Sequence, residues 1–257
     1  MNQKHLKSIS EKTCRKIFDK KINNFLDSPF PHLYIDNFFE EEFANTLLSS
    51  FPSLESEEWE VTEDSEIEVK MRSKWTSEFD IPENIVDAIR IMNSAPFLKE
   101  LSKALSIPKL IPDPYFSGGG LNITVSGGLL DVHVDGNYHD ATGLHRRVNA
   151  ILYFNPEWKE EWGGEFGLYD ATGDKVIKKI APLHNRFMAF DTNDFSFHGL
   201  PDPLNFPEGK ARRSIILYYY TKDPRPDSKV AVEQPHSALW KKKGWTDKRG
   251  NKTRNFQ

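Results

Sequence analysis

Hydrophobic and polar residues follow two different patterns along this chain, and the change falls near residue 110. Before it, apolar positions recur at the three- and four-residue spacing of an amphipathic helix in 39–51, 85–92 and 97–105. Ser94 stands just before Ala95-Pro96, where a serine hydroxyl can cap the free amides of a helix and proline tolerates the first turn. The pattern predicts a mostly helical region over residues 1–110.

From Ile111 onward the chain consists of short runs of Val, Ile, Phe and Tyr separated by Gly, Pro, Asp and Asn, which is typical of many short strands. The expected strands are 121–125, 130–135, 147–154, 165–169, 175–181, 187–191, 195–198 and 212–220. About eight such strands favour a double-sheet barrel or jelly roll, with the helical region packed on one outer face. The predicted fold class is therefore α+β, mainly β.

The strand expected over 147–154 separates two faces of this core, because successive side chains of a strand point to opposite sides. The positions expected to face the helices are Val148, Ala150, Leu152 and Phe154. The positions expected on the opposite face are Asn149, Ile151 and Tyr153.

Two polar stretches complete the predicted organisation. Residues 53–68 are acidic and are expected to form a solvated loop. After Pro226 the chain becomes polar, and we expect a solvated tail rich in basic residues, namely Lys241, Lys242, Lys243, Lys248, Arg249, Lys252 and Arg254. The predicted parts are a helical region at 1–110 packed on the core, a β core at 111–225 and a basic tail at 226–257.

Composition narrows the classes of protein that fit. A length of 257 residues suits one large core, and a formal net charge of −4 argues against a protein built mainly to bind nucleic acid. The single cysteine, Cys14, excludes an intramolecular disulfide and any metal site built from several cysteines. The sequence shows neither a run of about 18 apolar residues nor the apolar core of a secretory leader, so a cytoplasmic location is expected.

The strongest chemical signal is His133-Val-Asp135 at the end of an expected strand. Residues two apart on a strand share a face, so this imidazole and carboxylate can converge on one metal ion. His198 is the natural third ligand, and two histidines with one carboxylate form the ligand set of non-heme iron oxygenases. The competing histidines are His139, His145 and His184. A bare His-x-Asp is common by chance, so the assignment depends on the residues that accompany it.

One such residue lies in the last expected strand. Alternation places Arg212 on one face with Ser214, Ile216 and Tyr218, and a guanidinium can bind a carboxylate through two parallel hydrogen bonds. Arg213 points to the other face. A shift of one residue in register would exchange the two arginines, so at this point both remain candidates.

These residues give the sequence a family resemblance. From about Gly118 to Asp223 it resembles the prolyl-hydroxylase-type branch of the 2-oxoglutarate-dependent oxygenases, through His133-Val-Asp135, the segments 147–158, 163–166 and 185–190, His198-Gly199 and Arg212-Arg-Ser-Ile. The resemblance implies a double-stranded β-helix core and Fe(II) held by His133, Asp135 and His198. It also implies 2-oxoglutarate bound by Arg212, with Tyr153 and Ser214 as further contacts to its carboxylate. Where many relatives have a tyrosine about ten residues before the first histidine, this chain has Ile123.

The implied activity is hydroxylation of an unactivated carbon with O2 as co-substrate, coupled to decarboxylation of 2-oxoglutarate to succinate and CO2. The primary substrate is expected to be a prolyl or other side chain of a protein, or a small metabolite. No membrane partner is expected, and nucleic acid could bind only through the basic tail. Two alternatives stay open: a non-catalytic jelly-roll binding module, and a cupin-type metal hydrolase or isomerase.

Overall fold

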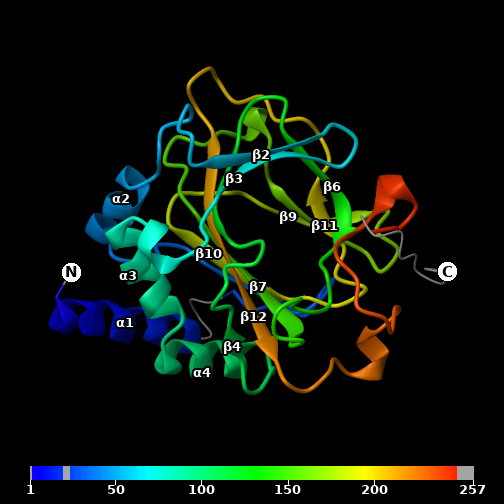
Figure 1. Cartoon of the computed structure of the whole chain (residues 1–257), viewed down its shortest axis with the longest axis horizontal. Coiled ribbons are helices and arrows are strands. Elements are labelled where there is room, and N and C mark those ends of the chain that lie inside the picture. Colours follow the sequence, from blue (N-terminus) through cyan, green and yellow to red (C-terminus); the bar gives the residue numbers. More distant parts are fainter. Residues whose placement is uncertain (1, 20–23, 248–257) are drawn as a thin grey trace.

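The computed structural model describes residues 2–19 and 24–247 of the chain (Figure 1). Its α-helices are α1 (Gln3–Phe18), α2 (Glu41–Ser49), α3 (Glu83–Met92) and α4 (Ala95–Ala104), and its 3-10 helices are η1 (Glu78–Asp80), η2 (Glu160–Trp162), η3 (Asp227–Lys229) and η4 (Lys241–Lys243). Its strands are β1 (His32–Ile35), β2 (Trp59–Asp64), β3 (Glu68–Ser73), β4 (Ile111–Pro112), β5 (Gly120–Thr124), β6 (Leu129–Val134), β7 (His145–Tyr153), β8 (Phe166–Tyr169), β9 (Val176–Ile180), β10 (Arg186–Asp191), β11 (His198–Leu200), β12 (Arg212–Thr221) and β13 (Leu239–Trp240).

The strands form one curled antiparallel sheet whose neighbours run in the order β1-β10-β7-β12-β5-β3-β6-β11-β8-β9. The strand β3 closes the curl because it pairs with β5 through Met71 and Ile123 and with β6 through Val69 and Leu129. The part β10-β7-β12-β5 therefore faces the part β6-β11-β8-β9 (Figure 1). Seven of the eight core strands expected from the sequence are present as β5 to β10 and β12, whereas the strand expected at 195–198 overlaps β11 only at His198. The mainly β, jelly-roll prediction is confirmed.

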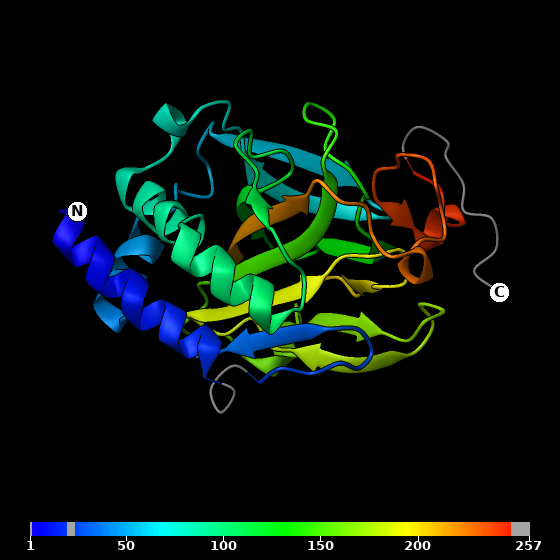
Figure 2. The same ribbon diagram turned by 90° about the horizontal axis from the view of Figure 1, so that it is seen from below.

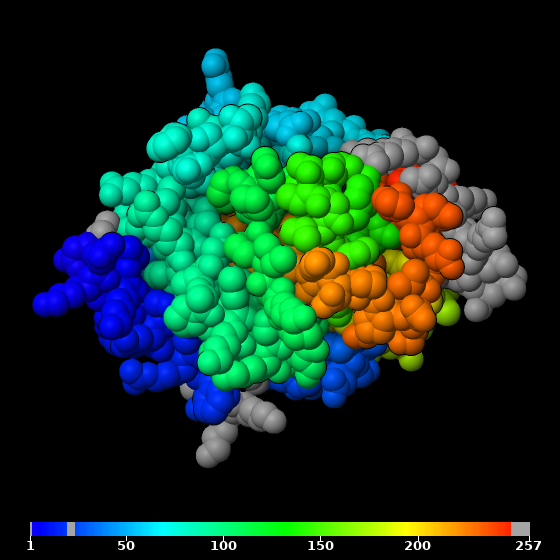
Figure 3. Space-filling view, turned by 60° about the horizontal axis from the view of Figure 1, so that its bottom comes forward, coloured from blue at the N-terminus to red at the C-terminus, as the bar shows by residue number. Residues whose placement is uncertain are grey.

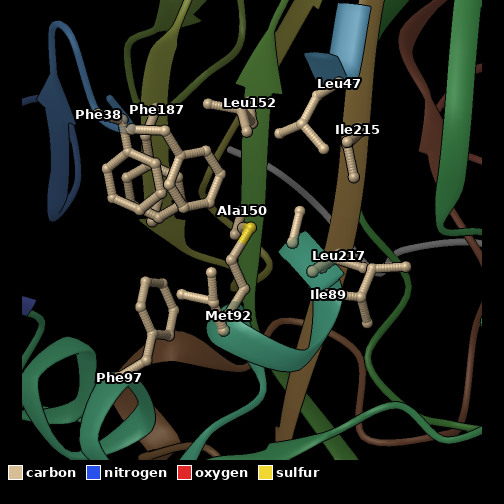
Figure 4. Packing of buried hydrophobic residues seen from close by; sticks show 14 of the residues in the cluster. Phe38, Leu47, Ile89, Met92, Phe97, Ala150, Leu152, Phe187, Ile215 and Leu217 are labelled. Carbon is tan, nitrogen blue, oxygen red and sulfur yellow. The ribbon is translucent and has the colours of Figure 1, made fainter. Parts of the chain in front are cut away.

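The four helices cover one outer face of this sheet, as the side view shows (Figure 2). Ser94 caps α4 by accepting a hydrogen bond from the amide of Phe97, as the sequence predicts. Beneath the helices, Leu152 and Ala150 of β7 and Leu217 of β12 pack with Phe187, Met92 and Phe97 (Figure 4). On the opposite face of β7, Ile151 and Tyr153 belong to a separate interior cluster. The alternation predicted for this strand is therefore observed, and it separates a packing face from a face that is turned into the barrel.

The region predicted as helical also contains three strands, and this is a correction to the sequence analysis. The acidic stretch 53–68 is not simply a solvated loop, because Trp59–Asp64 forms β2 and pairs along its whole length with β3. The residues of this hairpin are charged and weakly alternating, so their own pattern does not indicate strands. The pairing of β3 with β5 and β6 stabilises the hairpin, and the local sequence pattern does not reveal these distant partners.

The segment that follows β12 also differs from the prediction made from the sequence. Up to residue 247 it is not a solvated tail: β13 pairs with β6, and His236, Leu239 and Trp240 are buried. Figure 3 shows this segment, in orange, packed beside the green loops that precede β5 and follow β6. Lys248, Arg249, Lys252 and Arg254 of the predicted tail lie outside the described residues.

Candidate active site

The strand β6 carries two of the predicted metal ligands into the barrel. His133 and Asp135 are each 5% exposed, and both face the interior from the end of this strand. The Nδ1 atom of His133 lies 2.8 Å from the backbone carbonyl of Asp131. A carbonyl can only accept a hydrogen bond, so Nδ1 carries the proton and Nε2 presents its lone pair. The backbone thus fixes the orientation of the ring and the tautomer that a metal ligand needs.

His198 reaches the same place from β11, the neighbour of β6. It stands directly opposite His133 in the register of the two strands, with ring centroids 4.3 Å apart. Its Nδ1 lies 2.8 Å from the carbonyl of Ser196, so the same arrangement presents its Nε2 to the interior. Ligand atoms of His133, Asp135 and His198 all lie within 4.8 Å of one another. The structure therefore brings together the three residues singled out from the sequence.

The competing histidines lie elsewhere. His139 directs Nε2 to the carboxylate of Asp113 at 2.9 Å and to the hydroxyl of Ser117, which ties two loops together. His184 lies against Asn45 near the helical layer, and His145 opens β7 next to Tyr138. None of the three belongs to the ligand cluster found among the described residues.

The charges of the triad suit a divalent cation. Burial lowers the pKa of His133 to about 3, with His198 acting in the same direction, and burial also lowers the pKa of His198. Burial alone would raise the pKa of Asp135, but His198, Arg146 and His133 outweigh that effect and the pKa is lowered. At neutral pH the site therefore offers two neutral imidazoles and one carboxylate, which is the state in which these groups bind metal. This donor set fits Fe(II) with three coordination positions left open.

A cavity of about 370 Å³ opens in front of the triad. Its wall comes from the hairpin β2–β3, the strands β7 and β12, the loops that follow β4 and β6, and the segment 236–240. Arg146 lines this cavity, with its guanidinium 4.0 Å from the ring centre of Tyr218. Burial alone would lower the pKa of Arg146, but Tyr220, Tyr218 and Asp135 act in the opposite direction and raise it, so the charge is permanent.

The predicted co-substrate residues are buried in the barrel and are not among the residues that line the cavity. Tyr153 and Ser214 face each other across β7 and β12, and their next same-face neighbours, Ile151 and Ile216, line the cavity. Arg212 lies beside them, with Nε donating to the carbonyl of Gly164 at 2.7 Å and Nη2 donating to the phenol oxygen of Tyr153 at 3.3 Å. The hydroxyl of Ser214 is buried without a hydrogen-bond partner among the described residues.

The register settles which arginine faces the interior. Arg212 is buried on the inner face of β12, whereas Arg213 is half-buried on the outer face near Trp158 and Leu48. Burial lowers the pKa of Arg212, and Tyr153 opposes that effect. Burial raises the pKa of Tyr153, which keeps its phenol protonated. An interior guanidinium, a phenol and an open hydroxyl fit the far carboxylate of 2-oxoglutarate, and their role as its binding site stays a prediction.

Three residues of the site belong to no motif that is recognisable in the sequence. Arg146 and Asn149 of β7 face the cavity, and Asn149 was expected on this face without a role. Trp240 comes from the segment interpreted as a tail, and only its pairing with His133 through β13 and β6 brings it into the site. Alternation along β7 could have indicated Asn149 as a polar residue inside a core strand.

The segment 226–247 is held in place by buried charges. Asp194 lies 2.6 Å from Nη1 of Arg225 and 3.2 Å from Nε2 of His236, and it accepts hydrogen bonds from the amides of Ala231 and Val232. Nη2 of Arg225 donates to the carbonyl of Gly136, at the end of β6. The same network therefore anchors the segment and the strand that carries the metal ligands.

The lysines of the predicted basic tail are partly engaged within the chain. Lys241 pairs with Asp174 at 2.6 Å, and Lys243 pairs with Glu66 and Asp64 at the tip of the hairpin β2–β3. These contacts occupy two of the charges that were considered for an anionic partner. Among the described residues, no helix is long and apolar enough to cross a membrane.

Residues 119–220 match the model of the 2OG-Fe(II) oxygenase superfamily, and this range contains the triad, Tyr153, Arg212 and Ser214. This part of the chain, which is less than half of its length, is therefore similar to 2OG-Fe(II) oxygenases, and the predicted resemblance is confirmed over these residues. The triad is a donor set that could hold the Fe(II) of such a domain.

Among curated proteins, the chain is similar to prolyl 3-hydroxylase OGFOD1 of Mus musculus, at 29% identity over 106 residues. That match covers 38% of this chain and 19% of the mouse protein, so the chain spans about a fifth of its relative.

Two solved structures share the fold over most of the chain. A Trichoplax adhaerens prolyl hydroxylase in complex with a hypoxia inducible factor peptide fragment has a TM-score of 0.57 at 18% identity, covering 86% of this chain and 94% of that one. A Pseudomonas putida prolyl-4-hydroxylase also has a TM-score of 0.57, at 15% identity, covering 82% of this chain and 99% of that one. At these identities the likeness concerns the fold.

Proposed function

We propose that this protein is an Fe(II)- and 2-oxoglutarate-dependent dioxygenase that hydroxylates an unactivated carbon. The observation that carries the proposal is the buried triad of His133, Asp135 and His198, which faces a cavity that Arg146 also lines. Bound Fe(II), 2-oxoglutarate and O2 supply the oxidising power: one oxygen atom enters a C–H bond of the substrate, and the other enters the succinate that forms as CO2 leaves.

The residues of this chain bind, orient and exclude water. His133 and His198 hold their neutral tautomers through backbone carbonyls and, with Asp135, retain the metal. Arg212 and Tyr153 offer donors to the far carboxylate of 2-oxoglutarate, which directs its keto end towards the triad. Phe166 and Trp240 stack on the two imidazoles and keep water from their outer sides. No acid–base residue is required, since the cofactor set carries the difficult chemistry.

The substrate class we propose is a side chain of a protein, with a prolyl residue first. Support comes from the relatives described above. They are prolyl hydroxylases, and one of them is in complex with a peptide. A free amino-acid-like metabolite is the second candidate, since a cavity of about 370 Å³ lies at the small end of the range for ligand sites.

The test of the reaction is formation of succinate from 2-oxoglutarate by protein loaded anaerobically with Fe(II) and then exposed to O2. We expect His133→Ala to abolish it and His184→Ala, a histidine outside the triad, to leave it unchanged. Succinate formation that persists in His133→Ala, or its absence in the wild type, contradicts the proposal and favours a non-catalytic binding module. Metal-dependent turnover that persists without O2 indicates a hydrolase or isomerase of cupin type.

The test of the substrate is a mixture of peptides that contain prolyl, lysyl or asparaginyl residues, read by mass spectrometry. A gain of one oxygen atom on proline, dependent on 2-oxoglutarate, supports the proposed class. Oxygen gain by free proline or another free amino acid, with none in the peptides, assigns the metabolite class instead.

A further inference from the structure

The side chain of Asn149 lines the cavity beside the carboxylate of Asp135. It sits on the inner face of β7, is 4% exposed, and its Nδ2 lies 3.1 Å from Oδ2 of Asp135. A carboxylate accepts hydrogen bonds and donates none, so the NH2 end of the amide must face Asp135. The orientation of Asn149 is therefore fixed by the charge of its neighbour.

This orientation leaves the other end of the amide unsatisfied. The Oδ1 atom of Asn149 is buried and has no hydrogen-bond partner among the described residues. 2-Oxoglutarate carries two carboxylates and a ketone at neutral pH, all of them acceptors, so it cannot satisfy this oxygen. An unpaired buried acceptor is destabilising, and central strands are ordinarily built from β-branched or aromatic residues. The sheet alone therefore gives no reason for an asparagine at this position.

We propose that Asn149 is a positioning residue of the metal centre. Its amide holds Oδ2 of Asp135, so that the carboxylate offers the metal one oxygen rather than two. The terminal torsion of an aspartate is soft, and without this hydrogen bond the group can turn and bind through both oxygens. A second carboxylate oxygen on the metal would occupy a position that 2-oxoglutarate or O2 requires. The inference rests on the proposed function only in that the triad binds a metal.

The chain contains a matched control in Asn122 of β5. This residue is also 4% exposed, and its Oδ1 is likewise buried without a partner among the described residues. Its Nδ2, however, donates to the backbone carbonyl of Gly120 at 3.2 Å and touches no ligand of the metal. Substitution at Asn122 therefore measures the cost of losing a buried amide in the same sheet, without any effect on Asp135.

The experiment compares Asn149→Leu, Asn149→Ala and Asn122→Leu with the wild type, using Co(II) as the probe. Leucine keeps the branched shape of asparagine and alanine shortens the side chain, and both remove the donor. Calorimetric titration gives the Co(II) affinity, and the visible absorption of Co(II) reports its coordination number. Circular dichroism and the melting temperature of the metal-free proteins report folding separately.

We expect both Asn149 variants to bind Co(II) about 10- to 100-fold more weakly and to change its visible spectrum. Asn122→Leu should keep the wild-type spectrum and affinity. Wild-type Co(II) spectra and affinities in folded Asn149 variants overturn the inference, and Asn149→Ala decides if Asn149→Leu does not fold. A wild-type protein that binds no Co(II) overturns the inference and the proposed function together, whereas unchanged Asn149 variants overturn the inference alone.

Discussion

Trp240 lies against the imidazole of His133, with ring centroids 4.4 Å apart and 29° between the ring planes. His198 is stacked in a similar way on Phe166, at 5.1 Å and 25°. Each imidazole of the triad is therefore fixed at one nitrogen by a backbone carbonyl and over one face by an aromatic ring. The protein itself holds the predicted ligands in place, which would lower the cost of ordering them on metal binding.

Replacing Trp240 by alanine should weaken metal binding as well as the fold. Loss of a buried tryptophan costs about 3–5 kcal/mol of unfolding free energy, and here it also frees one face of His133. Urea denaturation and Co(II) titration measure the two effects. Trp240→Phe, which keeps an aromatic face, should recover most of the Co(II) affinity. Trp162→Ala is the control, since Trp162 packs on Phe206 away from the triad, and equal losses of affinity in both alanine variants would contradict the prediction.

Arg212 and Arg213 should differ sharply in their effect on 2-oxoglutarate. A hydrogen bond to a charged group contributes about 1.5–3 kcal/mol, so Arg212→Gln should raise the KM for 2-oxoglutarate by at least about tenfold. Arg213→Gln should leave this KM near the wild-type value, because that side chain points to the outer face of β12. Succinate formation at varied 2-oxoglutarate concentration gives both values, and a larger effect at Arg213 would reverse the assignment.

The stability of the metal-free protein should fall as the pH is lowered below about 6.5. Burial lowers the pKa of His133 from its ordinary value of 6.5 to about 3. Between these values the unfolded chain binds a proton that the folded chain does not. The free energy of unfolding is therefore unaffected by this group above pH 6.5 and falls progressively between pH 6.5 and pH 3. The loss from this group is at most about 1.4 kcal/mol per pH unit.

The measurement for this pH effect is urea denaturation in the presence of a chelator, between about pH 5 and 7.5. His133→Asn should flatten the dependence relative to the wild type, because asparagine does not titrate. Parallel curves for the two proteins would show that His133 does not contribute.

Asp194→Asn should strongly destabilise the protein, although Asp194 is not one of the predicted metal ligands. The carboxylate of Asp194 is buried between Arg225 and His236, and removing one partner of such a pair costs about 3–5 kcal/mol because a buried charge is left uncompensated. Asp174→Asn is the control. Asp174 is largely exposed and pairs with Lys241, so its loss should change the unfolding free energy little. Similar denaturation midpoints for both variants would argue against the buried network.

The sequence was informative wherever local pattern and tertiary structure agree. Period-two alternation in 147–154 indicated correctly which side chains of β7 pack under the helices and which face the barrel interior. Alternation in the last strand put Arg212 and Arg213 on opposite faces but left the register open, and the structure places Arg212 inside. The His-x-Asp spacing indicated correctly that His133 and Asp135 lie together, with His198 beside them. In these strands a single buried face imposes the pattern that the sequence displays.

The missed elements are those whose structure depends on distant partners. The hairpin β2–β3 is charged, and it forms because β5 and β6 provide strand edges to which β3 pairs. The segment 226–247 is polar, yet Asn137 accepts from the amide of His236 at 2.9 Å and Asp131 accepts from the amide of Lys242 at 2.7 Å. Backbone hydrogen bonds to side chains about a hundred positions away leave no periodic signal in the sequence.

Lys243 joins the segment after β13 to Glu66 and Asp64 on the hairpin β2–β3, and Trp240 completes the surroundings of His133. A ribosome releases His133 and His198 well before it releases these residues. A nascent chain can thus fold its barrel and assemble the three ligands while one side of the site is still open to water. The wall of the cavity closes only when residues 236–243 have emerged, so the site reaches its final form after the strands that carry the triad have paired.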